Sequence, residues 1–154
     1  MKGDPKVIEC LNVLLADELT AISQYMVEAE MLDNWGLTKL SEMEEKRAIT
    51  EMKHAEKLIS RILFLEGRPT VTKLNEMRIG ADVPQQFDND LAAEMGAIRG
   101  YNAGIKLCVE LGDNATRALL ESILQDEDAH ADEIETQKDR VAKMGMQVYL
   151  GMQI

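Results

Sequence analysis

Apolar side chains recur in steps of three and four residues along four long stretches of this chain. The first stretch opens at Asp4 and Pro5, which suit a helix cap and first helical position, and it ends before Gly36. Its inward face carries one charged member among apolar and aromatic residues: Ile8, Leu11, Leu15, Glu18, Ile22, Tyr25, Ala29 and Leu32. This spacing is typical of an amphipathic helix that buries one side.

Three further stretches show the same spacing of apolar side chains in steps of three and four residues, and a short tail follows them. We expect Gly67 to end the second helix and Asn114 to cap the fourth. The face of the second stretch is less regular, because Glu44 and Arg47 lie on it. The stretches cover residues 38–66, 84–112 and 114–144, and the tail at 146–154 predicts a short fifth helix. Four such faces predict an all-α fold, a four-helix bundle.

The linker between the second and third stretches is too long for a tight turn. Residues 68–83 span up to ~53 Å when extended, and a helix over residues 38–66 is ~44 Å long. We therefore expect one long crossover, with helices two and three parallel. Gly96, Gly100 and Gly104 recur at four-residue intervals on the third helix, and they predict a close contact with another helix or another subunit.

Length, charge and cysteine content narrow the class of protein. A chain of 154 residues predicts a single domain over residues 1–154. The net charge of −11 disfavours nucleic acid and anionic membranes as partners and favours cations. No apolar leader or membrane-length apolar run is present, so we expect a cytoplasmic protein. Cys10 and Cys108 lack CxxC spacing, and we interpret them as buried structural thiols.

Six ionisable residues interrupt the apolar faces and repeat between the two halves of the chain. Each histidine follows a glutamate by three residues, which puts both side chains on one helical face. A single glutamate precedes each of these pairs by 33 residues. A shift of 76 positions maps the first set onto the second, and it also maps Tyr25 onto Tyr101. The sets are Glu18, Glu51 and His54, and Glu94, Glu127 and His130.

Four carboxylates inside an apolar bundle need compensating positive charge, because each uncompensated charge costs several kcal/mol. Two divalent cations match the four negative charges. Carboxylates with one imidazole per ion suit iron or manganese better than structural zinc. One Glu from each of two helices and a Glu-x-x-His from each of the others is the ferritin-like di-iron pattern. We predict that Glu51 and Glu127 bridge two iron ions, with Glu18 and Glu94 as terminal ligands.

Tyr25 and Tyr101 lie two turns beyond the terminal glutamates on the same faces. Either tyrosine could hydrogen-bond a ligand, donate an electron, or serve as a core aromatic residue.

Four segments of the sequence resemble a known family. They are Met1-Lys2-Gly3-Asp4, Asn34-Trp35-Gly36-Leu37, Glu51-Met52-Lys53-His54-Ala55 and Ile62-Leu63-Phe64-Leu65-Glu66-Gly67. Along nearly its whole length the chain resembles bacterioferritin, the haem-containing bacterial ferritin. The resemblance implies a cytoplasmic shell of 24 subunits that stores a ferric mineral, with the six residues above as its ferroxidase centre.

The resemblance also implies a b-type haem between two subunits, held by Met52 of each, and a ferredoxin-type reductant as the candidate donor for iron release. Met52 is turned ~100° from the face of Glu51, so it serves a different site. The apolar walls of the haem pocket are expected from Leu19, Ile22, Met26 and Ile49.

The sequence departs from the family pattern at several positions. Lys46 and Thr50 stand where some members carry His and Asp as an extra iron site at the inner surface. Leu58 and Glu133 replace aromatic residues found near the centre in some members, which leaves Tyr25 as the candidate electron donor. Four polar residues match the family's subunit-junction pore, a predicted iron entry: Asn34, Glu66, Asp132 and Thr136.

The preferred function is that of a ferroxidase, an Fe(II):oxygen oxidoreductase that uses O2 or H2O2 in iron storage. A rubrerythrin-like peroxidase or a di-iron oxygenase could use the same six ligands, but no Cys pairs for a rubredoxin-like domain are present. A DNA-protecting miniature ferritin would place iron between subunits. A metal-free structural bundle is the remaining alternative, and the inward position of the charges counts against it.

Overall fold

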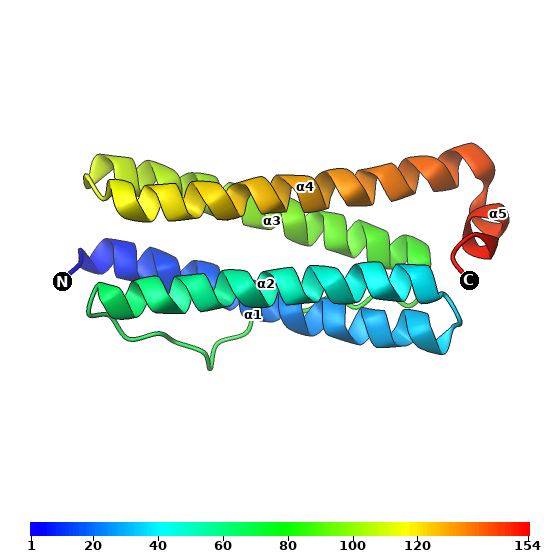
Figure 1. The fold of residues 1–154 in the computed structure, drawn as a ribbon, viewed down its shortest axis with the longest axis horizontal. Helices are drawn as coiled ribbons and strands as arrows, with labels where there is room; N and C mark the ends of the chain where they lie inside the picture. The colour runs from blue at the N-terminus through cyan, green and yellow to red at the C-terminus, as the bar shows by residue number, and fades with distance from the viewer.

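The computed structural model describes residues 1–154 and contains five helices and no strands. The helices are α1 (Pro5–Asn34), α2 (Thr38–Phe64), α3 (Val83–Glu110), α4 (Asn114–Met144) and the short α5 (Met146–Gly151). The four long helices lie side by side, and α5 lies at the end of the bundle opposite the N-terminus (Figure 1). Helix α1 packs on α2 and α3 on α4, and the two hairpins meet through α1 against α3 and α2 against α4. The predicted fold class is confirmed.

The segment between α2 and α3, residues 65–82, returns along the bundle, so α2 and α3 run parallel as predicted (Figure 1). It is held against α1 by backbone N–H groups: Asn75 donates to Thr20 Oγ1 and Gly80 donates to Glu28 Oε1, both at 2.8 Å. A Cβ on Gly80 would lie 2.3 Å from the backbone nitrogen of Gln86. Only glycine therefore lets the crossover approach the first turn of α3 this closely.

Two helix ends differ from the sequence-based expectation. Helix α2 ends at Phe64, and Glu66, not Gly67, takes the left-handed conformation, with φ of 61°. Gly67 serves close packing instead, because a Cβ there would lie 2.7 Å from Ile8 Cγ2. Helix α4 is capped by Asp113 rather than Asn114, since the Asp113 side chain accepts from the N–H of Thr116. A cap one position earlier satisfies the same free N–H groups.

The interior contains two apolar clusters. The larger surrounds Leu15 and Leu58 and includes Cys108, while the smaller surrounds Phe87 and Tyr149 near α5. Cys10 is only partly buried, and neither cysteine is in a disulfide. Between the clusters, the buried residues are mainly charged or polar. No helix is both long enough and apolar enough to cross a membrane.

The glycine row on α3 separates into two kinds of position. A Cβ on Gly104 would lie 3.0 Å from Leu120 Cδ1 of α4 and 3.1 Å from Cys10 Sγ of α1, so α3 approaches both helices closely here. A Cβ on Gly96 would meet only the end of the Arg99 side chain, at 3.8 Å. A Cβ on Gly100 would lie 3.2 Å from Leu14 Cδ2, so the predicted close helix contact exists at Gly100 and Gly104 and not at Gly96 within the chain.

We predict that Gly104→Leu lowers the free energy of unfolding by about 1–3 kcal/mol, because the larger side chain overpacks the contact between α1 and α3. The matched control Gly96→Ala should raise it by up to about 1 kcal/mol through helix propensity. Urea unfolding followed by circular dichroism measures both changes. Equal effects at the two positions would contradict the assignment of the close contact.

Candidate metal centre

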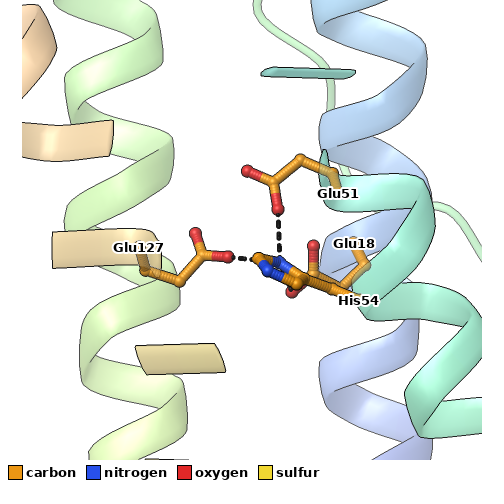
Figure 2. A group of neighbouring side chains, drawn as sticks. All are labelled: Glu18, Glu51, His54 and Glu127. Atoms are coloured by element: carbon orange, nitrogen blue, oxygen red, sulfur yellow. Dashed lines mark hydrogen bonds and ion pairs between the residues drawn. The ribbon is translucent and has the colours of Figure 1, made fainter. Parts of the chain in front are cut away.

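The structure brings all six predicted ligand residues together in the middle of the bundle. Their ligand atoms form two groups, and within each group all atoms lie within 4.8 Å of one another. One group is Glu18, Glu51, His54 and Glu127, and the other is Glu51, Glu94, Glu127 and His130. Figure 2 shows the first group, with side chains from three helices pointing toward one another. Glu51 and Glu127 belong to both groups.

The Glu-x-x-His spacing places each imidazole against the carboxylates. His54 Nδ1 lies 2.8 Å from Glu51 Oε2 on its own helix and 2.8 Å from Glu127 Oε1 on α4 (Figure 2). His130 Nδ1 lies 3.0 Å from Glu51 Oε1 and 3.6 Å from Glu94 Oε1. Both rings therefore turn the same nitrogen inward, and their centroids are 6.4 Å apart.

Each of the two tyrosines donates a hydrogen bond to a terminal glutamate in the other half of the chain. The Tyr25 hydroxyl donates to Glu94 Oε1 at 2.6 Å, and the Tyr101 hydroxyl donates to Glu18 Oε1. Burial raises the pKa of both phenols well above the ordinary value, so both remain donors. Of the three roles left open by the sequence, the geometry shows hydrogen bonding to a terminal glutamate for each tyrosine.

The two histidines differ in their outward partners. His54 Nε2 lies 2.8 Å from Asp126 Oδ2. The shift of 76 positions relates Asp126 to Thr50, but the Thr50 hydroxyl donates to the backbone carbonyl of Lys46 instead. The side chain of His130 is 13% exposed, against 1% for His54. Asp126 was not among the predicted site residues, and its only signal in the sequence is an acidic residue where the internal repeat has threonine.

Protons balance the charge of the metal-free centre. Burial raises the pKa of Glu18 to about 8 and that of Glu127 to about 12. Burial would also raise the pKa of Glu51, but hydrogen bonds with His130 and His54 bring it below its usual range. Burial opposes the charged form of His130, yet hydrogen bonds with Glu51 and Glu94 raise its pKa to about 9.

The pKa of His54 is raised in the same way, because hydrogen bonds with Glu127, Glu18 and Glu51 outweigh burial. The raised pKa values therefore favour protonated imidazoles and protonated Glu18 and Glu127 in the metal-free centre. Glu94 Oε2 is buried and has no hydrogen-bond partner. Oxygen and imidazole donors in two adjoining groups, with a buried oxygen left unpaired, fit two divalent ions with iron-like ligand preference.

A cavity of about 260 Å³ on the crossover side adjoins the centre. Its lining includes all four predicted ligand glutamates, together with Asn75 and Glu76 of the crossover. The four residues of the predicted junction pore are all exposed, but Asn34 and Glu66 lie at opposite ends of the bundle (Figure 1). One chain cannot form that pore alone, and iron entry through it stays a prediction.

Met52 lies on the outer face of α1 and α2 and is 44% exposed. It lines a groove of about 200 Å³ together with Ile22, Met26 and Ile49, three of the residues expected as walls of a haem pocket. Leu19 is not part of this groove and packs against the larger core cluster. The groove is open on one side.

The positions that depart from the family pattern have structural roles of their own. Leu58 is fully buried in the larger apolar cluster. Glu133 accepts a hydrogen bond from Arg47 at 3.1 Å. Arg47 and Glu44, the residues that interrupt the apolar face of α2, are both buried and bonded to each other at 2.7 Å. The irregular pattern of α2 therefore marked a buried ion pair.

Known proteins match this chain along most of its length. A family model described as a ferritin-like domain matches residues 8–144. Bacterioferritin of Rhodobacter capsulatus is 44% identical over 147 residues, covering 96% of this chain and 91% of the relative. Bacterioferritin of Brucella melitensis biotype 1 is 42% identical over 149 residues, covering 97% and 92%. Bacterioferritin BfrA of Mycobacterium tuberculosis is 41% identical over 149 residues, covering 97% and 94%.

We predict that Zn²⁺, a redox-silent stand-in for iron, raises the melting temperature of the metal-free protein, because it binds the folded state alone. The ligands must lose protons at Glu18, Glu127 and both histidines, so the affinity should rise between about pH 6 and about pH 9. Calorimetry in buffers of different ionisation enthalpy should detect the released protons. Melting curves unchanged by Zn²⁺ across this range would contradict a buried metal centre.

Proposed function

This chain belongs to the bacterioferritins, and from that membership we propose that it oxidises Fe(II) at the six-residue centre and stores the ferric product in a shell of identical subunits. The observation that carries the proposal is the sharing of Glu51 and Glu127 between the two ligand groups. Two carboxylates common to both groups are suited to bridge two metal ions.

The ligand roles follow from the two groups. Glu18 and His54 belong to one group only, and Glu94 and His130 belong to the other only. We therefore assign one terminal glutamate and one histidine to each ion. Two Fe(II) bound side by side supply two electrons together, so that 2 Fe(II) + O2 + 2 H⁺ gives 2 Fe(III) + H2O2.

The side chains around the ligands hold them in position. Tyr25 and Tyr101 donate hydrogen bonds to the two terminal glutamates, which limits rotation of their carboxylates. Asp126 does the same for the ring of His54. Such outer partners fix the orientation of metal ligands. Electron donation by Tyr25 stays a prediction.

We also propose a single domain over residues 1–154, assembly into 24 subunits, and a ferredoxin-type reductant for iron release. A b-type haem in the Met52 groove would supply an electron carrier between two subunits. A rubrerythrin-like peroxidase or di-iron oxygenase is disfavoured, because relatives named bacterioferritin match this chain over more than nine tenths of their length. Native mass spectrometry separates these functions: a particle of about 24 subunits supports storage.

We predict that Glu127→Ala slows the rapid oxidation of two Fe(II) per subunit by at least about tenfold, because the variant loses a ligand common to both ions. The matched control is Glu135→Ala, an exposed glutamate on the same helix, which should leave the rate unchanged. Stopped-flow absorbance after anaerobic loading and mixing with O2 measures the rate. Wild-type kinetics in the Glu127 variant would contradict the assignment of Glu127 as a bridging ligand.

For the haem, we predict that Met52→Leu abolishes the visible haem band of protein expressed with ample haem, because thioether sulfur is lost as axial ligand. Rapid iron oxidation should persist, since Met52 faces away from the centre. Met26→Leu, in the same groove, is the control and should retain haem. A Met52 variant that holds haem with an unchanged spectrum would show that the ligand lies elsewhere.

A further inference from the structure

A buried guanidinium lies inside a third set of carboxylates, next to the metal centre. Arg47 of α2 is only 2% exposed. Its acidic partners come from three helices: Glu44 of α2, Asp90 of α3 and Glu133 of α4. Each of these acids lies within two helical turns of a predicted ligand on its own helix, so the set adjoins the centre along the bundle. None of them belongs to the six predicted ligands.

The guanidinium lies where the oxygens of the three acids meet. Arg47 Nη1 donates to Glu44 Oε2 at 2.7 Å and lies 3.9 Å from Asp90 Oδ2. Arg47 Nη2 donates to Glu133 Oε2 at 3.1 Å. The Glu133 side chain is 44% exposed, so this acid connects the buried set with solvent. Arg47 therefore occupies the position that a cation entering past Glu133 would reach.

One guanidinium does not satisfy all the oxygens around it. Asp90 is fully buried, and its Oδ1 accepts from Gln24 Nε2 at 2.8 Å. Its other oxygen, Oδ2, is the one that lies nearest Arg47, and it has no hydrogen-bond partner. A single positive charge thus serves three carboxylates and leaves a buried oxygen without a donor. Oxygen donors from three helices around one point are the kind of set that holds a hard divalent cation.

Folding stability does not by itself explain a cation at this position. Apolar side chains of similar volume in place of a buried ion pair are often neutral or stabilising, because both charges of the pair lose their hydration. The neighbouring faces of the bundle are apolar, so a leucine could pack at position 47 without Glu44 as its partner. The charge of Arg47 therefore calls for a role beyond packing.

Arg47 is suited to exclude a metal ion from these acids. Its guanidinium is weakly hydrated and always charged, and it is attached to α2, so a free ion cannot exchange with it. A divalent ion beside it would face a fixed positive charge. Outside the two ligand groups of the centre, no set of three or more metal-binding side chains has ligand atoms within 4.8 Å of one another. The three acids around Arg47 are held apart by the guanidinium between them.

We propose that Arg47 is a resident cation that keeps a third metal ion out of the bundle and so limits each subunit to two ions. The proposal rests on the proposed ferroxidase function, in which two Fe(II) supply two electrons to one O2. The guanidinium lies 5.5 Å from the centre of the Tyr25 ring, and the Tyr25 hydroxyl donates to Glu94. A ferrous ion in place of the guanidinium would lie next to the pair and add a third electron. Arg47 is thus a specificity-determining residue for the number of ions.

The test is the number of Co²⁺ ions bound per subunit, measured by equilibrium dialysis of the full assembled protein. We expect two in the wild type and three in Arg47→Gln, with added intensity in the visible Co²⁺ bands. Arg47→Lys is the matched control and should bind two, because it keeps the positive charge. Adding Asp90→Asn to Arg47→Gln should return the number to two, since the third ion loses an oxygen ligand. A purely structural role of Arg47 would change the stability of these variants and not their metal content.

Arg47→Ser is the second variant, should Arg47→Gln fold poorly, and it should also bind three ions. Two ions in both neutral variants would overturn the role of Arg47. So would a third ion in Arg47→Lys, or a third ion that persists when Asp90 is also replaced. A wild-type protein that binds two Co²⁺ but does not oxidise Fe(II) would overturn the proposed ferroxidase function, whatever the variants bind.

Discussion

The cost of burying charge between two apolar clusters is the constraint on which this structure depends. Four glutamates and two histidines converge in the middle of the bundle, and five of the six are at most 3% exposed. An isolated buried charge is expensive, so the group must be neutralised as a set. In the metal-free chain the raised pKa values of Glu18, Glu127 and both histidines favour protons at these groups, and two divalent ions would replace them. Metal affinity, proton binding and fold stability are therefore linked at one place.

The internal repeat explains how a single chain builds a site for two ions. The two hairpins present the same residues at a shift of 76 positions, and each tyrosine bonds the terminal glutamate of the opposite hairpin. The repeat is broken outside the ligands, where Asp126 holds His54 and Thr50 leaves His130 without an equivalent partner. The two ion positions thus have the same kinds of ligand, but their histidines differ in hydrogen-bond partners and in solvent exposure.

The crossover connects the fold to this chemistry. Its length allows α2 and α3 to run parallel, which places one Glu-x-x-His on each hairpin facing the other. Gly80 brings the crossover against α3 and onto Glu28, and Asn75 borders the cavity beside the centre. A segment that looks like a connection in the sequence therefore covers both the cavity and the buried Glu28.

The amino-acid sequence was sufficient to predict the helices, the crossover and the convergence of the six residues, because helical periodicity and an internal repeat can be recognised along the chain alone. It could not decide which residue ends a helix: Glu66 takes the left-handed position because Gly67 is needed where Ile8 approaches. Nor could it assign Arg47, which interrupts an apolar face yet is buried with Glu44. Asp126 and Glu28 acquire partners only when separate segments of the chain meet. Contacts between helices depend on their rotation and separation, and those are fixed by packing of the whole bundle rather than by any one stretch of sequence.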